Sequence, residues 1–177
     1  RKGVYGLWSR DSKKFVLQKT DSRHIKDLWV INSSAKERPT IETYKYHMAG
    51  EQEFYKPYIE IFDIPSKGIT QVQLDTTVQQ SVGFYSHRYQ KNNSDKHKPA
   101  LLLSKKGKIY FNTISRDRKR FDVHVADINT GEVTTLIKEH FNTYIEWRGK
   151  QIRLFNNESE ILFWSERDGW GHYYLYD

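Results

Sequence analysis

Two pairs of carboxylates have a spacing that could hold a ligand. Glu51 and Glu53 would share one face of a strand, and Glu166 and Asp168 have the same spacing beside a predicted turn. A carboxylate pair neutralises and hydrogen-bonds an ammonium group, so either pair could bind a peptide amine. The alternative, which the sequence favours, is that these are solvated loop side chains paired with neighbouring lysines or arginines.

The sequence gives little support for a metal site or for a nucleophilic active site. The chain has no cysteine, which excludes a disulfide scaffold, a thiolate zinc site and a cysteine nucleophile. Its seven histidines are scattered without metal-ligand spacing such as His-Glu-x-x-His. No glycine belongs to a Gly-x-Ser-x-Gly elbow, and no nucleophile, base and orienting group can be nominated together. We therefore predict no metal, no cofactor and no catalytic residue, and the substrate-binding residues stay unassigned.

Basic and aromatic residues could also mark a binding surface. Lysine plus arginine is 29 and aspartate plus glutamate is 22, which gives a net charge of +7. The densest basic run, in a predicted loop between strands, could bind phosphates, but the charges are otherwise spread and no nucleic-acid-binding motif appears. We predict no nucleic-acid partner. Tryptophans could line a sugar or peptide surface, although packing between sheets is favoured. The basic run is Arg116, Arg118, Lys119 and Arg120, and the tryptophans are Trp8, Trp29, Trp164 and Trp170.

Length and composition fit one domain or a piece of a larger one. The 177 residues are 37% hydrophobic and 15% aromatic, with a mean hydropathy of −0.83, so large rings must carry much of the core. No apolar run is long enough to predict a membrane-spanning helix. The chain begins at Arg1 and ends directly after the strand-like run 173–176, from which we expect a segment of a longer protein.

Alternating strands and short turns dominate the chain, and helical periodicity is weak throughout. Residues 123–127 alternate in polarity before the turn 129–132 and the run 133–137, which predicts a β-hairpin. The same pattern joins 59–63 to 69–72.

A longer phrase recurs three times: a strand that starts near Phe15, Ile109 or Ile161, a polar loop, and a second strand. The second strands are predicted at 27–32, 122–127 and 173–177. Repeats of about 40 to 50 residues are typical of propeller blades. The sequence therefore predicts an all-β fold, a partial β-propeller of three to four blades of antiparallel strands. The approximate blades are 1–37, 38–80, 81–141 and 142–177, as parts of one domain.

Three ordered motifs carry a family resemblance: residues 8–14 (WSRDSKK), 38–51 (RPTIETYKYHMAGE) and 164–172 (WSERDGWGH). The chain resembles the N-terminal β-propeller of bacterial dipeptidyl peptidase IV-like serine peptidases, of the prolyl oligopeptidase family. The resemblance spans nearly the whole chain. It implies a parent protein in which a C-terminal α/β-hydrolase domain, absent from this chain, cuts dipeptides from peptide N-termini, often after proline.

The resemblance assigns this chain a non-catalytic role in shaping substrate access and positioning peptide N-termini. The family's amine-binding acidic pair is expected just upstream of the 8–14 motif. Residues 1–7 contain no carboxylate, so that pair is expected to precede the chain. The implied partners are the hydrolase domain and peptide substrates, the parent is periplasmic or secreted by analogy, and a homodimeric parent stays open.

Two further expectations accompany this interpretation. Sheet faces left uncovered at the ends of a partial propeller should make the chain self-associate. The alternative function is a protein- or ligand-binding propeller of a cell-envelope complex without hydrolase activity, because Trp-Ser-x-Asp phrases also occur in such propellers.

Overall fold

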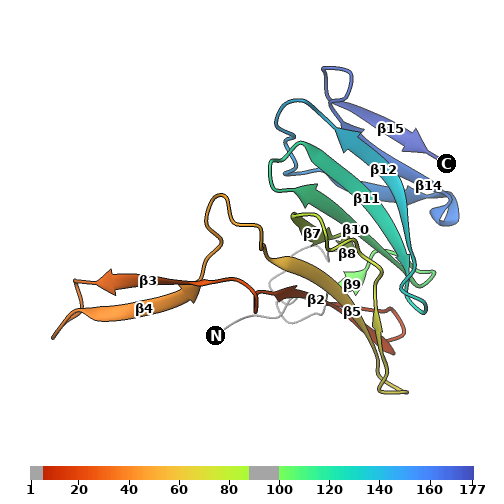
Figure 1. The fold of residues 1–177 in the computed structure, drawn as a ribbon. Coiled ribbons are helices and arrows are strands. Elements are labelled where there is room, and N and C mark those ends of the chain that lie inside the picture. The colour runs from red at the N-terminus through yellow and green to blue at the C-terminus, as the bar shows by residue number, and fades with distance from the viewer. Residues whose placement is uncertain (1–5, 88–99) are drawn as a thin grey trace.

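The computed structural model describes residues 6–87 and 100–177, and strands account for nearly all of their regular structure. The described part contains a single helical element, the 3₁₀ turn η2 (Asn156–Glu158). Figure 1 shows successive sheets stacked beside one another and one hairpin that extends away from them. The all-β prediction is confirmed.

The first sheet holds six strands in the order β6-β5-β2-β1-β9-β8. Neighbouring strands pair antiparallel, except for β1 and β9, which run parallel where Trp8 faces Leu101. The predicted hairpin of 59–63 with 69–72 is confirmed as β5 and β6. The strands are β1 (Gly6–Trp8), β2 (Lys14–Asp21), β5 (Lys56–Asp63), β6 (Ile69–Gln71), β8 (Ser86–His87) and β9 (Leu101–Leu102).

The second sheet is a four-stranded antiparallel unit in the order β12-β11-β10-β7. Its strands β11 and β12 form the second predicted hairpin, and a bulge between Val123 and His124 shifts their register. The strands are β7 (Gln80–Phe84), β10 (Lys108–Ser115), β11 (Arg120–Asp127) and β12 (Val133–His140).

The third sheet has three antiparallel strands in the order β13-β14-β15. They are β13 (Ile152–Phe155), β14 (Glu160–Ser165) and β15 (His172–Tyr176), so the strand predicted at 173–177 is confirmed to within a residue at each end.

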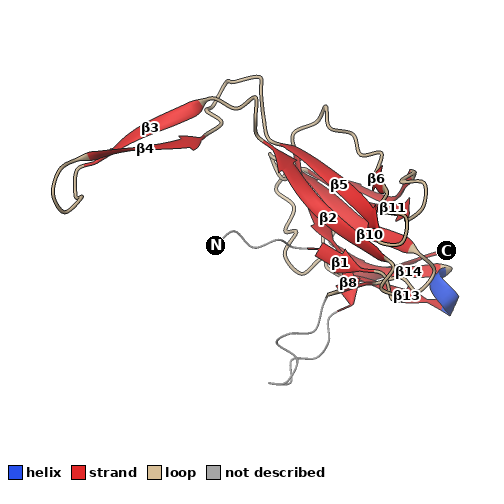
Figure 2. Cartoon of the chain, turned by 90° about the horizontal axis from the view of Figure 1, so that it is seen from below, coloured by secondary structure: helices blue, strands red, loops and turns tan. Residues whose placement is uncertain are grey.

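A two-stranded hairpin interrupts the first sheet, and the strand predicted at 27–32 belongs to it. Strand β3 (Asp27–Asn32) pairs only with β4 (Thr40–Lys45), whereas β2 pairs with β5. Lys14 faces Asp63 in the first sheet as Lys108 faces Asp127 in the second. The hairpin is therefore an insertion between two paired strands, and Figure 2 shows it projecting from the stack. The predicted division at 37/38 lies in the loop between β3 and β4.

Two hydrophobic cores lie between successive sheets. The first joins β2 and β5 to one face of β10 and β11, with Val16, Ile61 and Phe111 fully or almost fully buried. The second joins the opposite face of β10 and β11 to β14, where the rings of Phe121 and Phe163 stack with centroids 6.2 Å apart. Aromatic rings thus carry the second core, as the composition predicts. Because the second sheet is covered on both faces, it holds its neighbours in place.

One buried histidine in this stack predicts a pH effect on stability. His124 lies between the hydroxyls of Thr113 and Thr135, at 2.9 and 3.0 Å, and stacks on Phe111. Burial lowers the pKa of His124, with Asp122 opposing the effect and Arg120 and Lys138 adding to it. A lowered pKa means that the unfolded chain takes up a proton first as the pH falls. The stability that His124 contributes is therefore complete above its unfolded value of about 6.5 and is lost progressively below it.

The measurement is urea unfolding of the wild-type protein and of His124→Gln at pH 7.5 and pH 5.5. We expect the free energy of unfolding to fall more for wild type than for the variant over this interval. Equal losses in the two proteins would contradict the account of His124.

Candidate functional site

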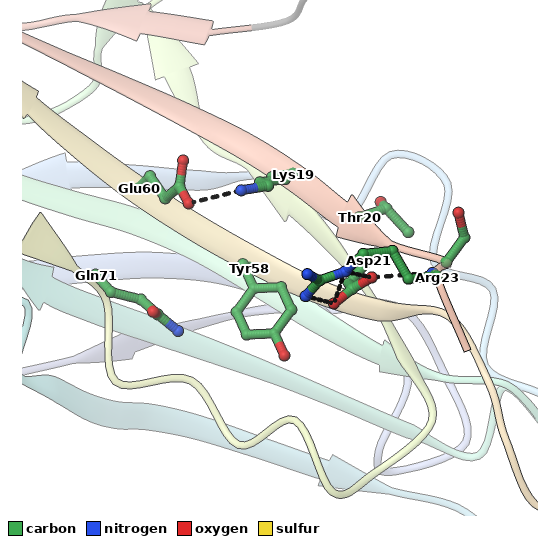
Figure 3. Close-up of a pocket in the computed structure, with 8 residues that line it drawn as sticks. Lys19, Thr20, Asp21, Arg23, Tyr58, Glu60 and Gln71 are labelled. Atoms are coloured by element: carbon green, nitrogen blue, oxygen red, sulfur yellow. Dashed lines mark hydrogen bonds and ion pairs between the residues drawn. The ribbon is translucent and has the colours of Figure 1, made fainter. Parts of the chain in front are cut away.

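An open polar depression of about 570 Å³ lies on the first sheet (Figure 3). Its charges neutralise one another: Nη2 of Arg23 lies 2.6 Å from Oδ2 of Asp21, and Nζ of Lys19 lies 3.2 Å from Oε1 of Glu60. The hydrogen bond from Arg23 holds the pKa of Asp21 well below its usual range. With its charges paired locally, the hollow has no group poised for acid–base or nucleophilic chemistry.

The first predicted carboxylate pair does not form a site. Glu51 and Glu53 lie in the loop after β4 instead of on a strand, so they do not share a strand face. Glu51 Oε1 lies 3.8 Å from Nζ of Lys26, and Glu53 Oε2 lies 3.9 Å from Nζ of Lys56. This is the solvated, lysine-paired arrangement that the sequence favoured.

The second predicted pair lies at the turn between β14 and β15. Both Glu166 and Asp168 are exposed, and Asp168 accepts a hydrogen bond of 2.5 Å from the hydroxyl of Tyr174. That bond raises the pKa of Tyr174. Asp168 thus contributes to closing the turn.

Histidines do not converge either. Within residues 6–87 and 100–177, no three side chains of the histidine, cysteine, aspartate or glutamate type gather as metal ligands could.

Among the described residues, no helix has the length and apolar character to cross a membrane.

The basic run forms the predicted loop, the turn between β10 and β11, but its cations diverge. Nη1 of Arg116 reaches His47, the guanidinium of Arg118 lies 4.8 Å from the ring centroid of Trp147, and Nε of Arg120 lies 3.2 Å from Asp122. The three guanidinium groups thus contact three different neighbours. The run is not a single phosphate-binding surface.

The tryptophans divide into two groups. Trp8 packs against Phe15 with ring centroids 5.0 Å apart, and Trp164 is partly buried, as expected for packing between strands. Trp29 and Trp170 are 74% and 78% exposed, so the packing role expected for them was wrong. Exposure of Trp29 follows from its place on the inserted hairpin.

The inserted hairpin presents one apolar face to solvent. Ile31 lies directly opposite Ile41, and Trp29 lies on the same face. Ile31 is 69% and Ile41 is 72% exposed. Figure 1 shows no other strand beside the hairpin, so this surface is available to a partner.

Sequence reasoning missed a buried ionic network between the second and third sheets. Nζ of Lys150 lies 2.7 Å from Oε2 of Glu139, and their side chains are 1% and 2% exposed. Ser165 donates a hydrogen bond to Glu139 Oε1, and Nη2 of Arg167 lies 3.6 Å from the same oxygen. The Lys150 ammonium also lies 5.1 Å from the ring centroid of Phe163. One signal was present: Glu139 follows Ile137 at strand spacing, which places a carboxylate on the buried face.

Two features thus stand out. The buried network fixes one sheet against the next, and the hairpin provides an exposed contact surface.

Comparison with known proteins agrees with this picture. The model of the "Dipeptidyl peptidase IV (DPP IV) N-terminal region" family matches residues 3–177. A search of curated proteins found no match.

Two solved structures share the fold. One is described as a dipeptidyl aminopeptidase IV from Bacteroides ovatus, with a TM-score of 0.72 and 15% sequence identity. The other is Porphyromonas gingivalis dipeptidyl peptidase 4, with a TM-score of 0.70 and 17% identity. Each comparison covers 98% of this chain but only 22% of the other, so the chain spans about a fifth of the length of these proteins.

Proposed function

The chain belongs to the family of dipeptidyl peptidase IV N-terminal regions, and from this premise we propose that it is a non-catalytic propeller segment of a serine-type dipeptidyl peptidase. The observation that carries the proposal is the family match over residues 3–177. The stack of three sheets supports the proposal, because a stack of sheets can enclose a chamber without any side chain that takes part in a reaction.

In the parent protein, the segment forms part of a chamber wall that restricts access to short or unfolded peptides. It presents their N-termini to a C-terminal α/β-hydrolase domain, which releases dipeptides, often with proline in the second position. The partners are thus the hydrolase domain and peptide substrates. By analogy with the family, we place the parent in the periplasm or outside the cell, which fractionation of the producing cells tests.

The access role predicts discrimination by substrate size. We expect the full-length protein to remove the N-terminal dipeptide from a ten-residue peptide but not from a tightly folded domain that carries the same first residues. The segment alone should cleave neither. Equal rates on the two substrates would contradict the sieving role, and repurified segment with turnover would contradict the non-catalytic assignment.

We also propose that the parent is homodimeric and that the apolar face of the β3–β4 hairpin contributes to the contact. Support comes from the exposure of Trp29, Ile31 and Ile41 and from the free edges of the two-stranded hairpin. The sequence suggested uncovered sheet ends as the contact, and exposed Tyr173 and Leu175 on β15 offer that surface as well.

The hairpin contact predicts the effect of one substitution on the oligomeric state. Trp29→Lys should weaken dimerisation of the full-length protein by about tenfold or more. A large aromatic ring that becomes buried in an interface is a typical hot spot for binding. Val30→Lys, on the opposite face of the same strand, is the matched control and should dimerise as wild type does. Sedimentation velocity reports both. A Trp29→Lys dimer of unchanged affinity would exclude this face, and a wild-type monomer would favour a different protein partner.

A further inference from the structure

His47 connects the base of the inserted hairpin to the second sheet. It lies in the loop that follows β4, and its Nδ1 is 2.6 Å from Nη1 of Arg116 and 3.2 Å from Nε2 of Gln79. Its other nitrogen, Nε2, is 3.1 Å from the carbonyl oxygen of Glu51. Both ring nitrogens are therefore engaged.

The partners of the ring assign its protonation state. A guanidinium only donates hydrogen bonds, so Nδ1 facing Arg116 must be an unprotonated acceptor. A carbonyl oxygen only accepts, so Nε2 must carry the hydrogen. The hydrogen-bond pattern thus requires a neutral imidazole with its proton on Nε2.

These contacts bridge segments that are far apart in the chain. Arg116 belongs to the turn between β10 and β11, and Gln79 directly precedes β7. The backbone N–H of Arg116 donates to the carbonyl of Gln79 at 3.2 Å, so the two partners of His47 are themselves joined. We propose that His47 is a proton-sensitive latch that holds the base of the β3–β4 hairpin against the second sheet and releases it in mild acid.

Protonation of Nδ1 removes the acceptor and places an imidazolium against the Arg116 guanidinium. Two donors of like charge then face each other, so both bonds of Nδ1 are lost. The Glu51 carboxylate of the same loop accepts from the Met48 N–H at 2.9 Å and lies 3.8 Å from Nζ of Lys26. A charged His47 is repelled by Arg116. Histidine is the side chain whose charge ordinarily changes between pH 5 and 8, so the test below compares pH values within that interval.

Two other titratable groups, Arg118 and Tyr55, line one hollow together with Arg116. On the other side of the loop, Nε2 of His24 donates to the carbonyl of Phe54 at 2.6 Å and lies 3.7 Å from Glu53. Protonation of His24 strengthens its attraction to Glu53, the opposite effect to that expected for His47. His24 is therefore a matched internal control.

Hydrogen–deuterium exchange of the full-length protein tests the latch. Exchange of peptides covering residues 46–55 is followed at pH 7.5 and pH 5.5. Each observed rate is compared with the intrinsic exchange rate of an unprotected amide at the same pH. We expect protection in this loop to fall by about tenfold at pH 5.5, as for loss of a hydrogen bond to a charged group. His24→Gln should retain the fall, whereas His47→Gln should show the same protection at both pH values.

Two results would overturn the proposal: protection that changes less than about twofold in wild type, or a fall that persists in His47→Gln. The readout needs neither peptidase activity nor a dimer, so failure of the latch and failure of the proposed function are distinguishable. A His47→Gln protein with weak protection at both pH values still supports the latch, because the pH dependence is gone.

Discussion

Replacing Glu139 by glutamine is expected to lower the free energy of unfolding by about 3 to 5 kcal/mol. The substitution preserves the size of the side chain but removes the charge opposite Lys150, whose side chain is only 1% exposed. A buried ammonium without a counter-charge is strongly unfavourable. Neither the Ser165 hydroxyl nor the Arg167 guanidinium, which lies 3.6 Å from Oε1 of Glu139, can supply the lost negative charge.

Two further variants make this prediction specific. Glu60→Gln breaks the exposed Lys19–Glu60 pair and should cost no more than about 1 kcal/mol. The double variant Glu139→Leu/Lys150→Met removes both buried charges and should recover most of the lost stability. Urea unfolding of the four proteins gives the comparison. A loss below about 1 kcal/mol for Glu139→Gln would show that the pair is not buried as described.

The second large effect is expected at Gly131, in the turn between β11 and β12, which contacts the first sheet at Gln71. Gly131 has φ of +74°, and an added Cβ would lie 2.5 Å from the carbonyl oxygen of Gln71. Its own carbonyl accepts a hydrogen bond of 2.8 Å from Gln73. Gly131→Ala therefore combines a left-handed backbone with a clash against a main-chain atom, at a cost of about 2 to 4 kcal/mol.

Gly149 separates these two contributions. It has a similar φ of +83°, but an added Cβ would meet nothing within 4 Å. Gly149→Ala should therefore cost only the backbone strain, about 1 to 2 kcal/mol. Thermal or urea denaturation of the two variants measures the difference. Equal destabilisation would mean that the β11–β12 turn does not press against the first sheet.

The sequence was most informative where structure is local. The β11–β12 hairpin was predictable because alternating residues flank a turn that contains Gly131, and turn type and alternation together set the register. The predicted hairpin at β5 and β6 is confirmed for the same reason.

Non-local pairing was not predictable in the same way. Residues 27–32 form a strand as expected, but alternation cannot reveal which strand it pairs with, and β2 pairs with β5 across an insertion of more than thirty residues. The exposure of Trp29 is the feature that marks the insertion, and it is visible only in the fold.

Site residues illustrate the same limit. The spacing of Glu51 and Glu53 suggested a strand face, but the loop that carries them turns each toward a different lysine. Glu139 and Lys150 meet because the chain returns from β12 to β13 beneath Phe121 and Phe163, a path that no spacing rule encodes. His47 and Arg116 likewise meet across 69 positions of sequence.

Hydrolysis of a Gly-Pro chromogenic amide by the full-length protein, assayed beside the 177-residue segment, tests the central claim most directly. We predict release of the chromophore by the full-length protein alone, and no release when the glycine amine is acetylated, because a dipeptidyl peptidase acts at a free N-terminus. A folded full-length protein without activity would contradict the peptidase assignment and favour a binding propeller. Activity of the segment itself would contradict its role as a scaffold.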